Sequence, residues 1–178
     1  MESLNESAIK VVAYRDSKGF AATTWDTLPV KLACIMCEIE ELTEALEDYS
    51  SNRQSLRSGT REVHFEVADV AMYSLSILRD LFDGQWTMRN VYHGGPRALA
   101  VPSELTKALR KETRGAFEQW RRGNFKDVMI HLELLIAALI DLRTRVIGLE
   151  GTLASDIDRK IEYAANRPPL HGGKDPRS

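Results

Sequence analysis

The feature that most constrains this chain is a helical hydrophobic period that runs through nearly all of its 178 residues. Apolar residues recur at intervals of three and four, and no run alternates apolar with polar residues as a half-buried strand does. Turn-forming and polar segments divide this pattern into six expected helices, at about 5–17, 28–49, 59–83, 102–122, 125–149 and 155–165. The third of these is expected to be capped by Ser58 or Thr60. The sequence therefore predicts an all-α helical bundle that forms a single domain over residues 1–178.

Composition and charge exclude several classes of function. The formal net charge of −2 gives no general attraction to nucleic acid. No apolar run approaches the roughly 20 residues needed to span a bilayer, and the polar first ten residues do not have the pattern of a signal peptide. Cys34 and Cys37 fall within a helical pattern with no second pair, which favours neither a disulfide framework nor a zinc site. We therefore expect a cytoplasmic protein with no nucleic-acid or membrane partner.

Two of the expected helices carry acidic residues beside their apolar faces. At ~100° per residue, Glu38 and Glu41 lie at the edge of the apolar face of 28–49, and Glu66 and Asp69 share a stripe with apolar residues of the next helix. Acids that face one another beside a core repel each other and take up protons, whereas a divalent cation removes this cost. Carboxylate oxygens are the preferred ligands of Mg²⁺. The pattern therefore predicts that these four acids bind Mg²⁺, with Mn²⁺ as an alternative ion.

Other acids and other metals fit this pattern less well. The remaining acids of the same helix are interpreted as a solvated face; they are Glu40, Glu44, Glu47 and Asp48. A di-iron carboxylate bundle needs glutamates with a histidine three residues later, and the sequence has no such pair.

Two parts of the chain resemble a known family. The run KLACIMCEIEELTEALEDY, followed by REVHFEVADVAMYSLSIL, resembles the E-x-x-E … E-x-x-D signature of the all-α nucleoside triphosphate pyrophosphohydrolases, which include MazG proteins, dimeric dUTPases and dCTP pyrophosphatases. The segment AYRDSKGF, with a later Trp and Leu-Pro, is similar to the family's first helix and connecting loop. The tail DRKIEYAANRPPLHGGK resembles its closing segment, although Ala164 stands where the family usually has Asn. The tail positions that fit are Lys160, Arg167, Pro168, His171, Gly172 and Lys174.

The resemblance implies Mg²⁺-dependent hydrolysis of a nucleoside triphosphate to the monophosphate and pyrophosphate, as nucleotide-pool house-cleaning by a homodimer. Residues 28–84 would then form a metal-binding hairpin and 155–178 a phosphate-binding tail. Glu41 or Glu44 would act as general base, and attack at the α or the β phosphorus stays open. The expected phosphate-binding residues are Lys31, Lys160, Arg167, His171 and Lys174. The expected base-binding residues are Phe20, Trp25 and Tyr73.

The segment 102–149 resembles the metal-binding hairpin without its acids. Aligning HFEVADVAMYSLSIL with HLELLIAALIDLRTR sets Asp69 beside Ile136, and aligning the preceding helices sets Glu41 beside Gly115. We interpret 102–149 as a degenerate second hairpin, with one live metal site per chain. Two alternatives stay open, namely a catalytically idle helical module that binds a nucleotide or a protein, and a pyrophosphohydrolase for phosphoribosyl-ATP.

Overall fold

The structure is a computed structural model that describes residues 4–51, 56–83, 102–144 and 151–166. Over these ranges the chain forms helices and no strands, so the predicted all-α fold is confirmed. The helices are α1 (Leu4–Ser17), α2 (Leu28–Ser51), α3 (Leu56–Phe82), α4 (Pro102–Arg121), α5 (Phe125–Leu142) and α6 (Leu153–Ala165). None of them is long and apolar enough to cross a membrane.

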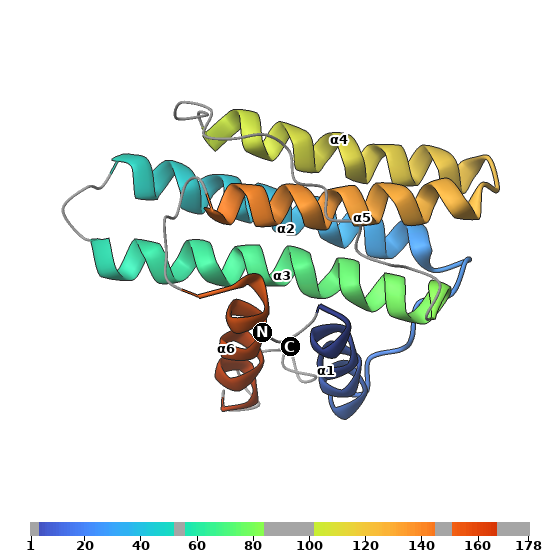
Figure 1. Ribbon diagram of the computed structural model, residues 1–178, viewed down its shortest axis with the longest axis horizontal. Coiled ribbons are helices and arrows are strands. Elements are labelled where there is room, and N and C mark those ends of the chain that lie inside the picture. The colour runs from blue at the N-terminus through green and yellow to red at the C-terminus, as the bar shows by residue number, and fades with distance from the viewer. Residues whose placement is uncertain (1–3, 52–55, 84–101, 145–150, 167–178) are drawn as a thin grey trace, which may run out of the picture.

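The four long helices α2 to α5 run side by side along the long axis of the molecule, and α1 and α6 lie across α3 (Figure 1). The helix α2 packs against α3 and α4, and α5 packs against α3 and α4. The helix α3 also contacts α1 and α6. The helix α3 is therefore shared between the four-helix layer and the pair of crossing helices, and residues on it can meet partners from both.

The apolar face of α2 is the one that its period predicts. Its members are fully buried, at 0–1% exposure, and follow one another at intervals of three and four residues; they are Leu32, Ile35, Ile39, Leu42 and Leu46. Burying each such side chain contributes roughly 1.5–3 kcal/mol. This face fixes the rotation of α2 about its own axis, and with it the direction in which the helix presents its acids.

Two predicted helix starts were placed too late. The helix α3 begins at Leu56, before the expected caps Ser58 and Thr60. A run of polar residues ends the stripe of buried side chains, but the helix itself can continue through that run, because each further helical residue adds a backbone hydrogen bond. The helix α6 begins at Leu153, where Thr152 is the N-cap and exchanges hydrogen bonds with Ser155. Ser155 is therefore the inner partner of a capping box and not the first residue of the helix.

The α-helical part of α5 ends at Leu142, and residues 143 and 144 continue it as a π-helical turn. That the helix extends to about residue 149 stays a prediction. Residues 145–150 lie outside the described part of the chain.

A buried ionic cluster attaches α6 to the rest of the bundle. The Asp156 side chain is 0% exposed; its Oδ2 accepts a hydrogen bond from Arg143 Nε at 2.5 Å, and its Oδ1 lies 3.1 Å from His64 Nδ1. Burial by itself would raise the pKa of Asp156, but the interactions with His64 and Arg143 outweigh it and lower that pKa. Because His64 belongs to α3 and Arg143 follows α5, the carboxylate joins three helices at one point.

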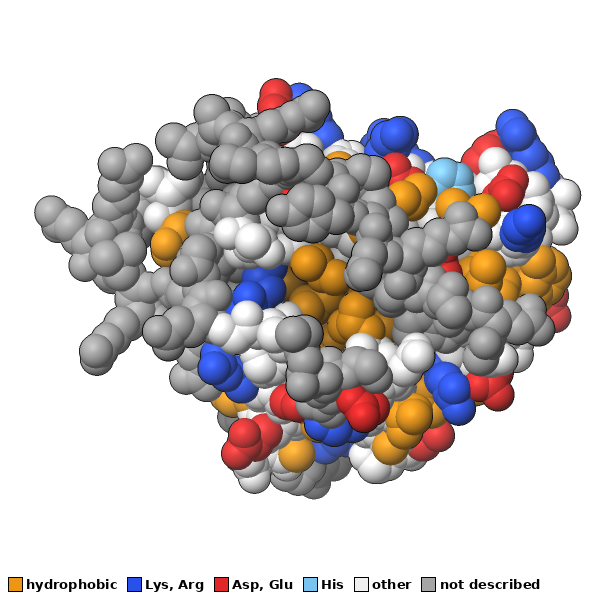
Figure 2. Space-filling view, in the orientation of Figure 1, with side chains coloured by type: hydrophobic (Ala, Val, Ile, Leu, Met, Phe, Trp, Pro, Cys, Tyr) orange, Lys and Arg blue, Asp and Glu red, His pale blue; other side chains and the backbone are white. Residues whose placement is uncertain are grey.

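Charged side chains of both signs are interspersed over the described surface on the face shown in Figure 2. Lys and Arg side chains do not gather there into a broad basic surface of the kind that contacts a nucleic-acid backbone. This face of the molecule agrees with the near-neutral charge of the sequence.

Candidate metal and phosphate site

Three of the four predicted metal ligands come together between α2 and α3. One carboxylate oxygen from each of three side chains lies within 4.8 Å of the other two; the residues are Glu38, Glu66 and Asp69. The spacing of three residues places Glu66 and Asp69 on the same side of α3, and the packing of α2 against α3 brings Glu38 to them. All three side chains are half-buried. We call these three residues the acidic cluster.

Glu41, the fourth predicted ligand, lies at the rim of the acidic cluster. It is exposed, yet its charge helps to raise the pKa of both Glu38 and Glu66. Glu44, the other predicted catalytic acid, is exposed one turn further along α2. The structure therefore separates an inner set of three half-buried carboxylates from outer carboxylates that are open to solvent.

The acidic cluster is strained electrostatically in the absence of a cation. Burial raises the pKa of Glu38 to about 7, and repulsion from Asp69, Glu41 and Glu66 adds to this effect. Burial likewise raises the pKa of Glu66 to about 7, with Asp69 as the largest charge contribution. The Oε2 atom of Glu66 is buried and has no hydrogen-bond partner among the described residues. An unpaired buried acceptor is unfavourable, and a set of carboxylate oxygens is the donor set that Mg²⁺ takes. The residues present therefore fit a divalent cation.

Lys160 of α6 reaches the acidic cluster from the crossing helix. Its ammonium group forms an ion pair with Asp69 and lies 5.1 Å from the centre of the Phe65 ring. The Phe65 ring in turn stacks on Tyr163 of α6, with ring centres 4.9 Å apart. Of the predicted phosphate-binding residues, Lys160 is thus placed directly at the acids.

A pocket of about 270 Å³ adjoins the acidic cluster, and Glu38 and Asp69 form part of its wall. It also contains three of the residues predicted to bind substrate, namely Lys31, Phe20 and Tyr73. The other residues that line it are Val11, Tyr14, Arg15, Met72 and Ser76. Acidic, basic and aromatic side chains therefore share one opening.

Other predicted site residues lie elsewhere. The Trp25 ring stacks on Phe125 with ring centres 3.7 Å apart, and the Trp25 carbonyl accepts a hydrogen bond from Trp120 Nε1. Trp25 does not line the pocket beside the acidic cluster. Arg167, His171 and Lys174 lie outside the described residues, so their predicted contacts with phosphate stay predictions.

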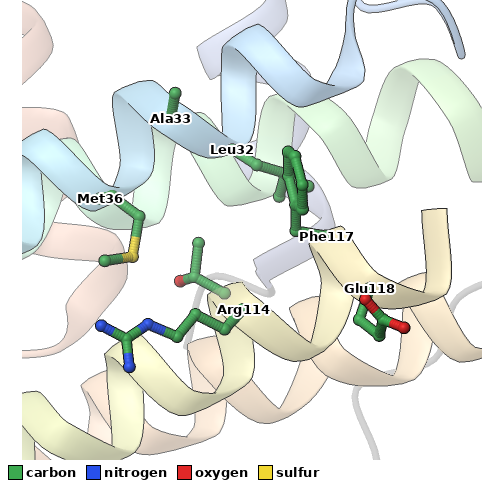
Figure 3. Close-up of a pocket in the computed structure, with 7 residues that line it drawn as sticks. Leu32, Ala33, Met36, Arg114, Phe117 and Glu118 are labelled. Atoms are coloured by element: carbon green, nitrogen blue, oxygen red, sulfur yellow. The ribbon is translucent and has the colours of Figure 1, made fainter. Parts of the chain in front are cut away.

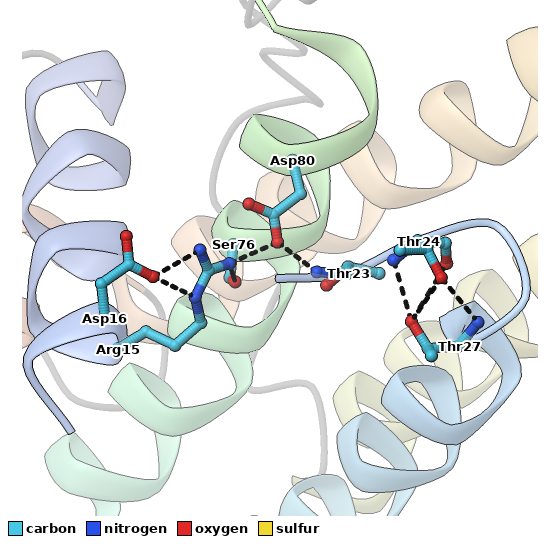
Figure 4. A network of polar contacts seen from close by, with 7 residues as sticks. All are labelled: Arg15, Asp16, Thr23, Thr24, Thr27, Ser76 and Asp80. Atoms are coloured by element: carbon cyan, nitrogen blue, oxygen red, sulfur yellow. Dashed lines mark hydrogen bonds and ion pairs between the residues drawn. The ribbon is translucent and has the colours of Figure 1, made fainter. Parts of the chain in front are cut away.

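One wall of this pocket is formed by α1 and the loop that follows it, and a polar network fixes this wall in place (Figure 4). Arg15 pairs with Asp80 and donates to Ser76 Oγ at 3.1 Å. Asp80 also accepts a hydrogen bond from the backbone nitrogen of Thr23 at 2.6 Å. The network thereby fastens α1 and the segment before α2 to α3. Arg15, Ser76 and Asp80 were not among the predicted site residues, although Ser76 and Asp80 follow Asp69 by 7 and 11 residues, which places them on the same stripe of α3.

Tyr73 joins the pocket to the first cysteine of α2. Burial raises the pKa of Tyr73 to about 12, and the hydrogen bond with Cys34 and the charge of Glu38 add to the shift. The phenol is therefore protonated at neutral pH. Cys34 and Cys37 are both free thiols, and Cys37 is exposed.

The second hairpin has a filled space where a further carboxylate would be needed. A Cβ atom added to Gly115 would overlap the His131 ring, and His131 Nδ1 lies 2.8 Å from Glu112 Oε2. Ile136, aligned with Asp69, is fully buried. Among the described residues, Glu38, Glu66 and Asp69 are the one group of His, Cys, Asp and Glu side chains that could hold a metal ion. That 102–149 is a true repeat of the first hairpin stays a prediction.

A second pocket, of about 330 Å³, lies between α2 and α4 (Figure 3). Phe117 of α4 points toward Leu32 of α2, and Met36 closes the same groove. The groove is mainly apolar, and its one carboxylate, Glu118, already pairs with Arg121 and Arg122. Its wall also includes Arg114, but it holds no cluster of carboxylates like the acidic cluster, so among the described residues it offers no comparable site for a metal ion.

Comparison of the chain with protein-family models, with curated proteins and with solved structures found no match.

Proposed function

We propose that the chain is an Mg²⁺-dependent nucleoside triphosphate pyrophosphohydrolase, which converts a ribo- or deoxyribonucleoside triphosphate and water into the monophosphate and pyrophosphate. The observation that carries this proposal is the acidic cluster, which contains an unpaired buried oxygen of Glu66 and contributes Glu38 and Asp69 to the wall of a pocket lined also by basic and aromatic side chains. The sequence resemblance to the all-α pyrophosphohydrolases supports it independently. In this proposal the protein acts as a homodimer in the cytoplasm and removes unwanted nucleotides from the pool.

The acidic cluster would hold the metal, because Glu38, Glu66 and Asp69 together offer the oxygen ligands that Mg²⁺ prefers. Bound Mg²⁺ supplies charge neutralisation of the triphosphate and lowers the pKa of the attacking water. Without a cation, these three carboxylates would repel the triphosphate from the pocket.

The remaining residues of the site have distinct roles in this proposal. Glu41 is at the rim and exposed, so it can accept the proton of the attacking water, with Glu44 as the alternative base. As the oxygen of that water bonds to the α or the β phosphorus, the phosphoanhydride bond between these two phosphorus atoms breaks, and the monophosphate and pyrophosphate separate. Lys31 and Lys160 would neutralise the phosphate oxygens. The Phe20 ring, which is 60% exposed at the pocket, is free to stack on the base.

The test is turnover of each of the eight common nucleoside triphosphates by the purified chain with Mg²⁺, followed by measurement of both the monophosphate and pyrophosphate. We expect release of the two products in equal amounts from at least one substrate. Asp69→Asn should abolish it while helical circular dichroism is unchanged, and Glu40→Gln on the outer side of α2 should leave it intact. Turnover of none of these substrates would contradict the proposal. Turnover of phosphoribosyl-ATP in the same assay would point to the related activity, and binding without any turnover to an idle module.

A further inference from the structure

The Lys160 ammonium is placed where it balances part of the charge of the acidic cluster. It pairs with Asp69, and the two side chains are 17% and 21% exposed, respectively. Lys160 thus brings a cationic group from another helix into direct contact with Asp69, and its charge also lowers the pKa of Glu38 and Glu66 against the other causes that raise it. A divalent ion that binds Asp69 would be placed beside this ammonium group, and the two cations would repel each other at short range.

The helix α6 is fixed in the bundle, whereas the Lys160 side chain that it carries can rotate about its own bonds. The helix α6 is held by the buried Arg143–Asp156 pair and by Leu153 and Ile157 in the core. The lysine ammonium is joined to this helix by a flexible four-carbon stem. Displacing the ammonium from Asp69 therefore requires rotation of one side chain and no movement of the helix.

The Lys160 ammonium group has a second contact besides Asp69. In the position in which it pairs with Asp69, Lys160 Nζ lies 5.1 Å from the centre of the Phe65 ring, within the range of a favourable cation–π interaction. The Phe65 ring is held by its stacking on Tyr163. The ammonium can therefore leave Asp69 and still remain at the edge of the site.

We propose that Lys160 is a built-in counter-ion of the metal site: its ammonium group competes with the metal ion for Asp69 in the nucleotide-free protein and turns to the triphosphate once metal and nucleotide bind together. This inference rests on the proposed function, because it requires that the acidic cluster bind a divalent cation. Its consequence is coupling between the two ligands. The metal alone must displace Lys160, whereas a metal–triphosphate complex provides new partners for both charges, so each ligand favours the binding of the other.

The test compares Mn²⁺ affinity in the full-length wild-type protein with that in Lys160→Gln and Lys160→Met, by electron paramagnetic resonance of free Mn²⁺ without nucleotide. We expect Kd for Mn²⁺ to fall by on the order of tenfold in both variants, because a repelling charge beside the ion is removed. Lys160→Arg keeps the charge and should retain the wild-type Kd. The matched control is Lys10→Gln. Lys10 of α1 pairs with Asp158 of α6, the helix that carries Lys160, at 3.0 Å between Nζ and Oδ1. Its removal should leave the Kd for Mn²⁺ unchanged.

A second measurement tests the other half of the inference. The affinity for a non-hydrolysable triphosphate at saturating Mg²⁺ should fall in Lys160→Gln and Lys160→Met, opposite in sign to the change in metal affinity. Unchanged or weakened Mn²⁺ binding in the two variants, with normal binding by the wild type, would overturn the inference and leave the proposed function standing. Absence of Mn²⁺ binding in the wild type would overturn both.

Discussion

The electrostatic strain of the acidic cluster makes a prediction about folding stability that needs no substrate. In the metal-free protein, Glu38 binds its proton more tightly in the folded than in the unfolded state, because burial and neighbouring acids raise its pKa from 4.5 to about 7. The folded state therefore loses stability as the pH rises from about 4.5 through 7. The shift of about 2.5 units sets a ceiling of roughly 3 kcal/mol, at 1.36 kcal/mol per unit. Because the side chain is only half-buried and titrates together with Glu66, we expect about 1–2 kcal/mol.

Glu38→Gln should remove this loss, since the amide resembles the protonated acid. The assay is urea unfolding followed by circular dichroism in the presence of EDTA, at pH 5 and at pH 8. We expect the variant to equal the wild type at pH 5 and to be more stable by about 1–2 kcal/mol at pH 8. Glu40→Gln, two residues along the same helix, should behave in the opposite way at pH 8, because it breaks the pairing with Arg110 that lowers the pKa of Glu40. A Glu38→Gln variant less stable than the wild type at pH 8 in EDTA would refute the reasoning.

Further predictions follow from the same geometry. Mg²⁺ binding at pH 7 should release about one proton, because Glu38 and Glu66 have pKa values of about 7 and are each about half protonated there. The affinity for Mg²⁺ should fall as the pH falls below 7. Calorimetry in buffers of different ionisation enthalpy measures both, and binding without proton release would contradict the prediction. Arg143→Leu removes one of the two partners of the buried Asp156 and leaves only His64, and urea unfolding should show a loss of about 3–5 kcal/mol. Lys10→Leu, which breaks the exposed pair with Asp158, should cost far less. Gly115→Ala should cost about 1–3 kcal/mol through overlap with His131, and the additional substitution His131→Ala should recover part of that loss; an additive double variant would show that the overlap is relieved elsewhere.

The parts of the site that could be predicted are those set by the phase of single helices. The period of α2 fixes both its buried face and the side on which Glu38 lies, and the same argument placed Glu66 and Asp69 on one stripe of α3. The outward position of Glu41 was missed, because a residue at the edge of an apolar face is buried or exposed according to how closely the neighbouring helix approaches. That approach depends on the packing of side chains from both helices and is not a property of either sequence alone.

The contacts that α3 makes with the crossing helices α1 and α6 could not be predicted from the hydrophobic period of the sequence. Arg15 and Asp80 are 65 residues apart in sequence, and Lys160 and Asp69 are 91 apart. The family resemblance pointed to Lys160 as a phosphate ligand but not to its pairing with Asp69 of the acidic cluster. The position of α6 depends on Leu153 and Ile157 in the core and on the buried Asp156, whose partners are His64 of α3 and Arg143 at the end of α5.

The two histidines that the predicted repeat aligns have different partners. His64 on α3 is buried and lies 3.1 Å from Asp156 of α6, and it is not a member of the acidic cluster. His131 on α5 pairs with Glu112, and its ring fills the space beside Gly115. The crossing helix therefore does two things for the first hairpin, since it provides an acid that engages the histidine and a lysine that balances the cluster. The second hairpin has no such helix packed across it among the described elements. The proposed metal site therefore depends on α6 as well as on α2 and α3, because Lys160 and Asp156 both come from α6.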